Sequence, residues 1–343
     1  MYKINSFEFY RYEDIIKKED DAGYDKTAFE KMLEIKGDSD HTKLIDMLTD
    51  LNDYSIGIED VLKEHFDEEN IVYWMAFQIL MGNVDTQNRN VYLYSPLNSD
   101  IWYFIAWDND GCLMRSEYEL KNFSDQGSWE KGISNYWGNV LFQRCLKSRS
   151  FREKLNDAIL ELREYLNKDM LISKIESYKN VLKPYLYSMP DAEYEPLTSE
   201  QYDQIVASLP DEIEKNYKLY LESLETPMPF YIGVPTIDGN KLKFNWDVSY
   251  DLDAEDITYS VEVARDYLFQ DVIYHNTTLT VPETEMDLPE AGQYFVRIRA
   301  TNTSGKTQDA FDYYVTDEGK HYGMKCFYIT EDSTVEEDNY EEG

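Results

Sequence analysis

Four polar side chains within one thirty-residue stretch have the types and spacing that phosphoryl transfer uses. The stretch, residues 82–111, reads GNVDTQNRNVYLYSPLNSDIWYFIAWDNDG and contains Asp85, Asn90, Asp108 and Asp110. Carboxylate and carboxamide oxygens without a nearby histidine or thiolate suit a hard cation, Mg²⁺ or Ca²⁺, better than zinc. In phosphoryl transfer one Asp orients the attacking hydroxyl, while an Asn and a second Asp hold metal ions that bridge the phosphates.

A β-hairpin is expected to bring these side chains together. VYLY and IWYFIAW read as two strands, and SPLNSD between them contains the Pro and Asn typical of turns. In an antiparallel hairpin, Asn90 before the first strand and Asp108 after the second lie at the same end. Five residues of loop tether Asp85 to that place. The run IVYWMAFQILM at 71–81 is apolar on nearly every face and predicts a buried helix that Gly82 ends.

The stretch resembles the CotH family, the spore coat protein H kinase-like proteins of bacteria. In that family G-N-x-D-x-x-x-x-N precedes a short hairpin that ends in W-D-x-D, as GNVDTQNRN and FIAWDNDG do here. MYKINSF and DEENIVYWMAFQILM are also similar, so the resemblance covers about residues 1–225. It implies that Asp85 is the catalytic-loop Asp and Asn90 a metal ligand. Asp108 would be the metal-binding Asp equivalent to that of a kinase D-F-G, with Asp110 as the alternative.

The sequence also departs from the family pattern. Ala106 stands where the family usually has Pro, and GCLMRSE is not a familiar continuation. Family members have an N-terminal lobe that covers the nucleotide and supplies a phosphate-binding Lys, and this chain is expected to begin near the end of that lobe. Lys3, Lys17 and Lys18 show no strand context that would make them substitutes. The chain is therefore expected to hold the metal ligands and to lack half of the nucleotide site.

The resemblance implies phosphorylation of Ser or Thr hydroxyls of a protein substrate, dependent on Mg²⁺ and ATP. The intact protein would be secreted or at the cell surface, although no signal peptide is visible. The alternative is a non-catalytic extracellular scaffold or adhesion protein with a degenerate kinase-like fold, one that could bind Ca²⁺. An EF-hand register places Asp108, Asp110, Gly111, Leu113 and Glu117 in line. It also puts Ala106 at the first ligand position, after a strand where a helix is needed.

Composition excludes several kinds of partner. The 343 residues contain 68 Asp plus Glu against 33 Lys plus Arg, a net charge of −35. Nucleic acid and anionic membrane surfaces are therefore not expected as partners. The longest apolar run is about half of the ~20 residues that cross a bilayer, so membrane insertion is not expected either. Three distant cysteines and four scattered histidines predict neither a disulfide framework nor a zinc site. The oligomeric state is open.

Two domains of different class are expected, a multidomain α+β organisation. The pattern of residues 1–225 predicts a mostly helical domain in which DKTAFEKMLEIKG forms one helix that ends at Gly37. The resemblance to the CotH family implies that this domain is a kinase-like C-terminal lobe. From 226 the apolar period changes to two, which predicts an all-β sandwich to residue 330. Residues 331–343 are acidic and predict a disordered tail.

The β domain resembles a fibronectin type III module. In that reading Trp246 lies in the core of its second strand, and Tyr294 in its sixth strand packs inward or provides a corner hydroxyl. Trp129 and Trp137, in GSWEKGISNYWGN, could line a substrate groove or fill the helical body, and the packing role is favoured.

Overall fold

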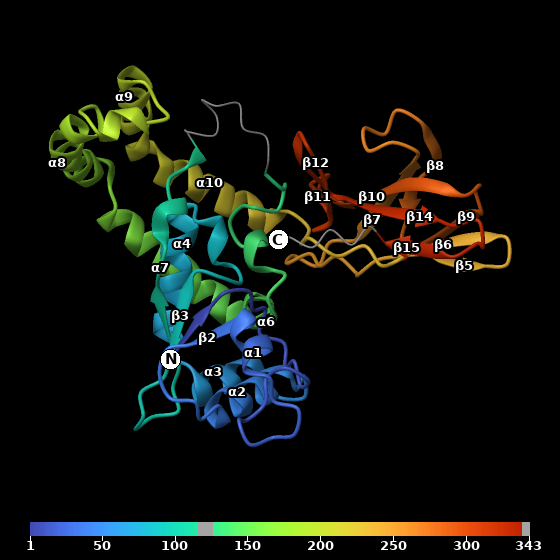
Figure 1. The fold of residues 1–343 in the computed structure, drawn as a ribbon, viewed down its shortest axis with the longest axis horizontal. Helices are drawn as coiled ribbons and strands as arrows, with labels where there is room; N and C mark the ends of the chain where they lie inside the picture. The colour runs from blue at the N-terminus through green and yellow to red at the C-terminus, as the bar shows by residue number, and fades with distance from the viewer. Residues whose placement is uncertain (116–125, 338–343) are drawn as a thin grey trace. The chain divides into compact units, whose positions relative to one another are not determined.

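The computed structural model describes residues 1–115 and 126–337 and divides them into two compact units (Figure 1). The first contains residues 1–115 and 136–220, and the second contains 126–135 and 221–337. The second unit thus starts at Leu221, slightly before the predicted boundary at 226, and it also takes a segment from the middle of the chain. The architecture is mixed α+β.

The first unit is built from helices around a small antiparallel sheet. Its strands are β1 (Tyr2–Ile4), β2 (Leu33–Ile35), β3 (Val91–Tyr94) and β4 (Tyr103–Ala106), in the order β2-β1-β3-β4. Its helices are α1 (Lys26–Met32), α2 (Thr42–Asn52), α3 (Ile58–His65), α4 (Glu68–Met81), α6 (Val140–Lys147), α7 (Arg149–Tyr165), α8 (Lys168–Leu186), α9 (Ser199–Ser208) and α10 (Glu212–Glu225), whose last residues enter the second unit. None of the helices in the described residues is long and apolar enough to cross a membrane.

Helix α4 is the central helix of the first unit, as its apolar sequence predicted. Asp67 caps its first turn by accepting a hydrogen bond from the Asn70 backbone N–H at 2.9 Å. Gly82 ends it with φ 66°, a left-handed conformation that favours glycine. The Trp74 ring stacks on Phe142 of α6 with centroids 5.6 Å apart and lies 4.9 Å from Phe104 of β4. The end of α4 is therefore fixed by packing on several sides.

The second unit consists of packed antiparallel sheets. A three-stranded sheet has the order β5-β6-β9, and a larger one the order β15-β14-β10-β7-β8 with β11 on β10; β12 and β13 form a separate hairpin. The bounds are β5 (Thr236–Asp238), β6 (Lys241–Asn245), β7 (Ile257–Ala264), β8 (Val272–Leu279), β9 (Glu283–Asp287), β10 (Gly292–Asn302), β11 (Thr307–Asp309), β12 (Tyr313–Thr316), β13 (Gly319–Tyr322), β14 (Met324–Ile329) and β15 (Val335–Glu337).

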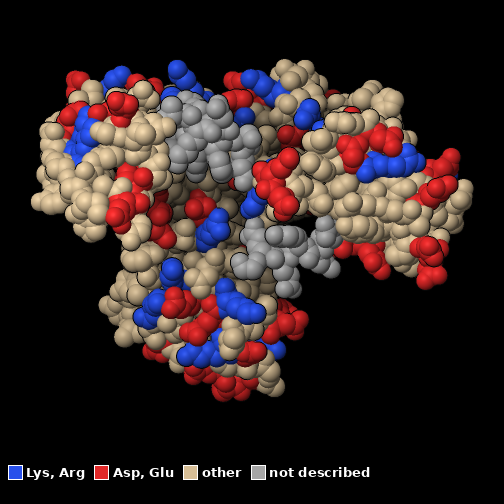
Figure 2. All heavy atoms as spheres, turned by 45° about the horizontal axis from the view of Figure 1, so that its top comes forward, with Lys and Arg blue, Asp and Glu red and all other residues tan. Residues whose placement is uncertain are grey.

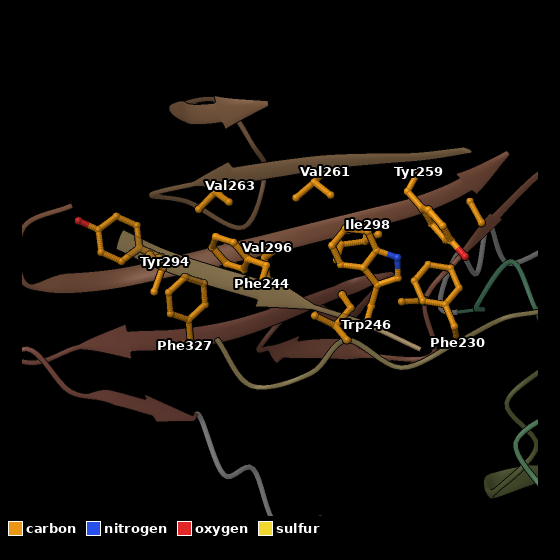
Figure 3. Packing of buried hydrophobic residues seen from close by; sticks show 14 of the residues in the cluster. Phe230, Phe244, Trp246, Tyr259, Val261, Val263, Tyr294, Val296, Ile298 and Phe327 are labelled. Atoms are coloured by element: carbon orange, nitrogen blue, oxygen red, sulfur yellow. The ribbon is translucent and has the colours of Figure 1, made fainter. Parts of the chain in front are cut away.

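Aromatic and branched side chains from both sheets form one core in this unit (Figure 3). Trp246, just after β6, is 5% exposed and packs against Tyr259 of β7 at 5.3 Å between ring centroids. Tyr294 of β10 is buried, and its hydroxyl donates to the Glu290 carbonyl at 2.8 Å. Both residues have the packing roles that the sequence predicted.

Two predictions of local structure are wrong. The helix predicted for DKTAFEKMLEIKG ends at Met32, and Leu33–Ile35 instead forms β2, which pairs with β1. Residues 335–337 of the predicted disordered tail form β15, because β14 offers an open strand edge and Thr330 and Thr334 close a turn before it. Residues 338–343 lie outside the described residues.

Figure 2 shows how charged side chains are distributed over one face of the molecule. On the face drawn in Figure 2, carboxylates alternate with lysines and arginines over much of the visible surface. Some basic groups of the chain pair with nearby carboxylates, as Lys179 and Lys183 do with Asp203. On this face the negative net charge therefore does not by itself mark a site.

Candidate functional site

The predicted hairpin forms, and its register places Asn90 and Asp108 at the same end. Val91, the first residue of β3, pairs with Ala106, the last residue of β4. Asn90 therefore immediately precedes the paired region, and Asp108 lies two residues beyond it. Asn90, just before β3, and Asp108, just after β4, both have a left-handed backbone conformation, with φ 58° and 56°. Asn and Asp tolerate this conformation better than most residues do.

Asp85 lies in a short 3₁₀ turn, η1 (Val84–Thr86), which follows directly from the end of α4. The buried Asn83 caps this turn, because its Oδ1 accepts a hydrogen bond from the Asp85 backbone N–H at 3.3 Å. The buried Thr86 hydroxyl lies 3.1 Å from the Tyr136 hydroxyl and also bonds to the Asn83 carbonyl. The Asp85 side chain is 39% exposed, so a firmly held backbone presents an accessible carboxylate.

The loop of Asp85 and the WDNDG segment meet at Gly111. An ideal Cβ at Gly111 would lie 3.2 Å from Asn83 Oδ1 and 3.7 Å from Asp85 Oδ2. The Asn109 side chain strengthens this junction, because its Oδ1 accepts hydrogen bonds from Gln78 Nε2 at 3.2 Å and Asn83 Nδ2 at 3.4 Å. Asp85 therefore lies beside the segment that carries Asp108 and Asp110.

Asp108 and Asp110 are exposed on either side of Asn109. Across residues 1–115 and 126–337, no side-chain hydrogen bond or ion pair engages either carboxylate. Asp110 still affects its surroundings: burial, then the negative charge of Asp110, raise the pKa of the Cys112 thiol to about 12. Within the described residues, the two carboxylates therefore lack the loop hydrogen bonds that Asp side chains commonly accept.

Distant parts of the first unit hold the loop that follows Asp85. Glu8 accepts from Asn88 Nδ2 at 2.7 Å and from the Tyr12 hydroxyl at 2.5 Å. Burial, with the Glu8 hydrogen bond, raises the pKa of the Tyr12 hydroxyl. Asn139, which caps α6, donates to the Gln87 carbonyl at 2.9 Å. Sequence reasoning missed these residues, because a hydrogen bond between segments 52 or 80 residues apart leaves no local pattern.

Asn216 of α10 supports the turn at the end of α4. Its Nδ2 donates to the Leu80 carbonyl at 3.0 Å, and its Oδ1 accepts from Arg115 Nε at 2.6 Å. A Cβ at Gly82 would lie 2.6 Å from Asn216 Nδ2, a distance that real Cβ atoms do not reach. Gly82 is therefore needed both for its left-handed conformation and for this close approach.

Asn70 fixes the hairpin to α4. Its Oδ1 accepts from the Phe104 N–H at 2.7 Å, and its Nδ2 donates to the Phe104 carbonyl at 3.1 Å. One side chain thereby pairs with both backbone groups on the free edge of β4. The edge is blocked at this position against pairing with another strand.

Comparison with known proteins identifies the first unit. The family model for the CotH kinase protein matches residues 1–220, which is most of the chain and includes the whole candidate site. The chain belongs to the CotH kinase family. No match is found among curated proteins.

Similar solved structures add nothing to this assignment. The twitchin kinase region from C. elegans is 17% identical with a TM-score of 0.20, over 28% of this chain and 19% of that one. The surface layer protein SbsC, domains 1–6, is 11% identical with a TM-score of 0.16, over 95% of this chain and 41% of that one. The chain thus spans less than half of either protein, and both TM-scores are too low to support an argument about the fold.

The remaining candidate residues fall into three groups. In this CotH family member Lys3 lies on β1 in register with Tyr92, so the prediction that it lacks strand context is wrong. Lys17 and Lys18 lie outside the strands and helices. Trp137 is buried in the first unit, whereas Trp129 packs in the second unit against Phe311 at 5.0 Å. Both tryptophans have packing roles, but Trp129 does not fill the helical body as expected.

The EF-hand register does not fit the structure. Strand β4 precedes Asp108, where an EF-hand requires a helix, and Glu117 lies outside the described residues. In the described parts of the chain, no group of three or more His, Cys, Asp or Glu side chains is arranged to hold a metal ion. A cation at the end of the hairpin would therefore have to use the Asn90 amide oxygen together with carboxylates.

Proposed function

We propose that this chain carries the catalytic loop and metal-binding residues of a protein kinase of the CotH type. The reaction would transfer a phosphoryl group from ATP to a Ser or Thr hydroxyl of a secreted or surface protein. One observation carries the proposal: the Asp85 carboxylate lies against Gly111, at the end of the hairpin where the register places both Asn90 and Asp108. The family match to residues 1–220 supports it independently.

Each side chain then has a separate role. Asp85 would orient the substrate hydroxyl and accept its proton as the hydroxyl oxygen bonds to the γ-phosphorus and the bond from that phosphorus to the leaving ADP breaks. Its Oδ1 is paired with Arg89 at 2.8 Å, whereas its Oδ2 is the oxygen near Gly111, so Oδ2 is the better placed of the two for this role. Asn90 and Asp108 would provide the oxygen ligands of the cation, with Asp110 as the alternative to Asp108.

The donor set fits Mg²⁺. Amide and carboxylate oxygens are its preferred protein ligands, and Mg²⁺ binds through one or two carboxylates while it keeps several waters. The exposed Asp108 and Asp110 leave room for such a partly hydrated ion. When both are bound, ATP would supply the phosphoryl group, and Mg²⁺ would neutralise the negative charge on the phosphate oxygens. Ca²⁺ in a geometry other than an EF-hand would use the same ligands.

A second candidate is a non-catalytic extracellular scaffold. The Asp85–Arg89 ion pair favours it, because an Arg that occupies the loop carboxylate competes with a substrate hydroxyl. The proposed fibronectin type III character of the second unit agrees with either function, since such modules are common spacers. The corner hydrogen bond of Tyr294 and the core position of Trp246 support that character.

Transfer of radiolabel from [γ-³²P]ATP separates the two functions. The full-length protein is incubated with a generic protein substrate and MgCl₂ or MnCl₂, as wild type and as Asp85→Asn, Asn90→Ala and Asp108→Asn. Loss of the proton acceptor should lower the rate by about 100- to 10 000-fold. Loss of either metal-binding residue should raise the metal concentration that half-maximal transfer requires.

Asp100→Asn is the matched control, because Asp100 is an exposed carboxylate at the turn end of the same hairpin. It should leave transfer unchanged. Transfer that survives Asp85→Asn at the wild-type rate would remove Asp85 from the reaction. Absence of transfer with every metal, together with no binding of Mg²⁺ and ATP by calorimetry, would favour the scaffold.

A further inference from the structure

Helix α8 exposes an apolar stripe that no part of the described chain covers. Tyr178, Val181, Leu182 and Tyr185 recur at intervals of three and four residues, so they share one face of the helix. Met189, three residues past the end of the helix, is a further exposed apolar side chain. The exposed fractions are 64%, 60%, 51% and 67% for the four helical residues and 68% for Met189. Single exposed apolar residues are common, but four on one helix face, with a fifth shortly beyond its end, mark an interaction surface.

The other faces of α8 are already accounted for. Lys179 and Lys183 form ion pairs with Asp203 of α9 at 3.2 and 2.6 Å, so one face packs against α9. Ser173, Ser177 and Asn180 form an exposed polar face. The apolar stripe is thus a third face of the helix, distinct from the lysine face and the polar face, and its contact with water is unfavourable.

We propose that the stripe docks on the same stripe of a second copy of this chain, with the two α8 helices antiparallel. Along the stripe the order is Tyr178, Val181, Leu182 and Tyr185, so aromatic and aliphatic residues are placed symmetrically about the midpoint between Val181 and Leu182. A two-fold axis at that midpoint brings Tyr178 of each copy onto Tyr185 of the other. Isologous contacts of this kind require a self-complementary surface, which the symmetry of the stripe provides.

Charge favours the antiparallel direction. Lys174 is the charged residue on the stripe, one turn before Tyr178, and Asp191 and Glu193 follow Met189 at the opposite end. Helix side chains lean toward the N-terminus, so the Lys174 side chain reaches past the start of the stripe. In an antiparallel pair it approaches the acidic end of the other copy, whereas a parallel pair would place the two Lys174 side chains together.

The exposed area fits a weak dimer. The five side chains expose roughly 600 Å² per copy, so the pair would bury about 1,200 Å², near the lower limit of specific interfaces. A dissociation constant of roughly 10–100 µM is therefore expected. Helix α8 itself carries four lysines against Asp169 and Glu176, but each chain has a net charge of −35. Salt that screens this long-range repulsion should strengthen the dimer.

Sedimentation velocity of the full chain over a concentration series tests the pairing. Wild type should form a dimer, more strongly in 300 mM than in 50 mM NaCl. Val181→Glu with Leu182→Glu should weaken the dimer at least tenfold. Ser173→Glu with Asn180→Glu adds the same charge on the polar face and should change the dissociation constant less than threefold. A monomer at 200 µM in both salts, or a dimer that survives Val181→Glu with Leu182→Glu, would overturn the proposal.

Disulfide formation tests the direction without disturbing the core. In a Cys112→Ser background, Leu182→Cys lies near the axis and should cross-link to itself on mild oxidation. Tyr178→Cys should cross-link to chains that carry Tyr185→Cys, but slowly to itself, because the two 178 positions are about 10 Å apart along the helices. Efficient self-cross-linking of Tyr178→Cys would indicate parallel helices and exclude the antiparallel pair.

Discussion

The loop that carries Asp85 and the segment that carries Asp108 and Asp110 lie side by side but are held very differently. The first is fixed by hydrogen bonds with Glu8 and Asn139, which are distant in the chain, and with the adjacent Asn83. In the second, Asn109 is anchored while the flanking carboxylates stay exposed. A group that orients a reacting hydroxyl needs a rigid backbone, whereas ligands of a hydrated cation need free oxygens.

The largest loss of stability should follow substitution of Gly82, which ends α4 and begins the loop of Asp85. Gly82→Ala places a methyl group against Asn216 and forces an L residue to φ 66°. The Asn216 hydrogen bonds to Leu80 and Arg115 must then shift, and we expect a loss of about 2–4 kcal/mol in the free energy of unfolding. Thermal unfolding followed by circular dichroism should show a melting temperature lower by roughly 5–10 °C.

Gly305→Ala provides the control for Gly82→Ala. Gly305 has φ 78°, but nothing lies within 4 Å of its ideal Cβ. Only the cost of the left-handed conformation remains, about 1–2 kcal/mol. Equal losses for the two variants would show that the contact with Asn216 does not matter.

A smaller loss of stability is expected from Asn83→Ala, and almost none from Asp110→Asn. Asn83→Ala leaves the Asp85 N–H without its acceptor and removes one donor to Asn109, so the free energy of unfolding should fall by about 1–3 kcal/mol. Asp110→Asn should change it by less than about 0.5 kcal/mol, because that carboxylate is exposed. Urea titration of both variants measures the difference. A larger loss of stability for Asp110→Asn than for Asn83→Ala would contradict the view that the Asp85 loop is the rigid one and the segment with Asp108 and Asp110 the exposed one.

The smallest change expected from a substitution, a few-fold in reaction rate, concerns the Cys112 thiol beside Asp110. With its pKa raised to about 12, the thiol stays protonated at pH 8.5 and should react with iodoacetamide roughly 1,000-fold more slowly than an ordinary exposed cysteine. Asp110→Asn removes a neighbouring negative charge, which should lower this pKa and speed the reaction a few-fold.

The raised pKa of the Cys112 thiol also predicts how the stability of the protein changes with pH. The unfolded thiol ionises near pH 9 and the folded thiol near pH 12, so between these values the folded state binds the proton and stability falls as pH rises. Below pH 9 this contribution is constant. Mass spectrometry of labelled peptides gives the rates, and a fast reaction of Cys112 in wild type would contradict the burial.

The sequence by itself determined the features that depend on local patterns. The apolar run predicted the buried α4, and Gly82 marked its end. Two aromatic runs with a turn between them predicted β3 and β4, and hence that Asn90 and Asp108 lie at one end. The change of period near residue 226 predicted the strands of the second unit. Periodicity and turn chemistry act between neighbours in the chain, so one sequence is enough to see them.

Only the tertiary structure decided which residues hold the site. Asn216, Glu8 and Asn139 contact the loop from distant segments, and nothing in their local sequence indicates that role. Leu33–Ile35 became a strand because β1 offered a partner, against its own helical pattern. Hydrogen bonds and strand pairing across long separations depend on how the elements pack, and packing energy outweighs the small local preferences.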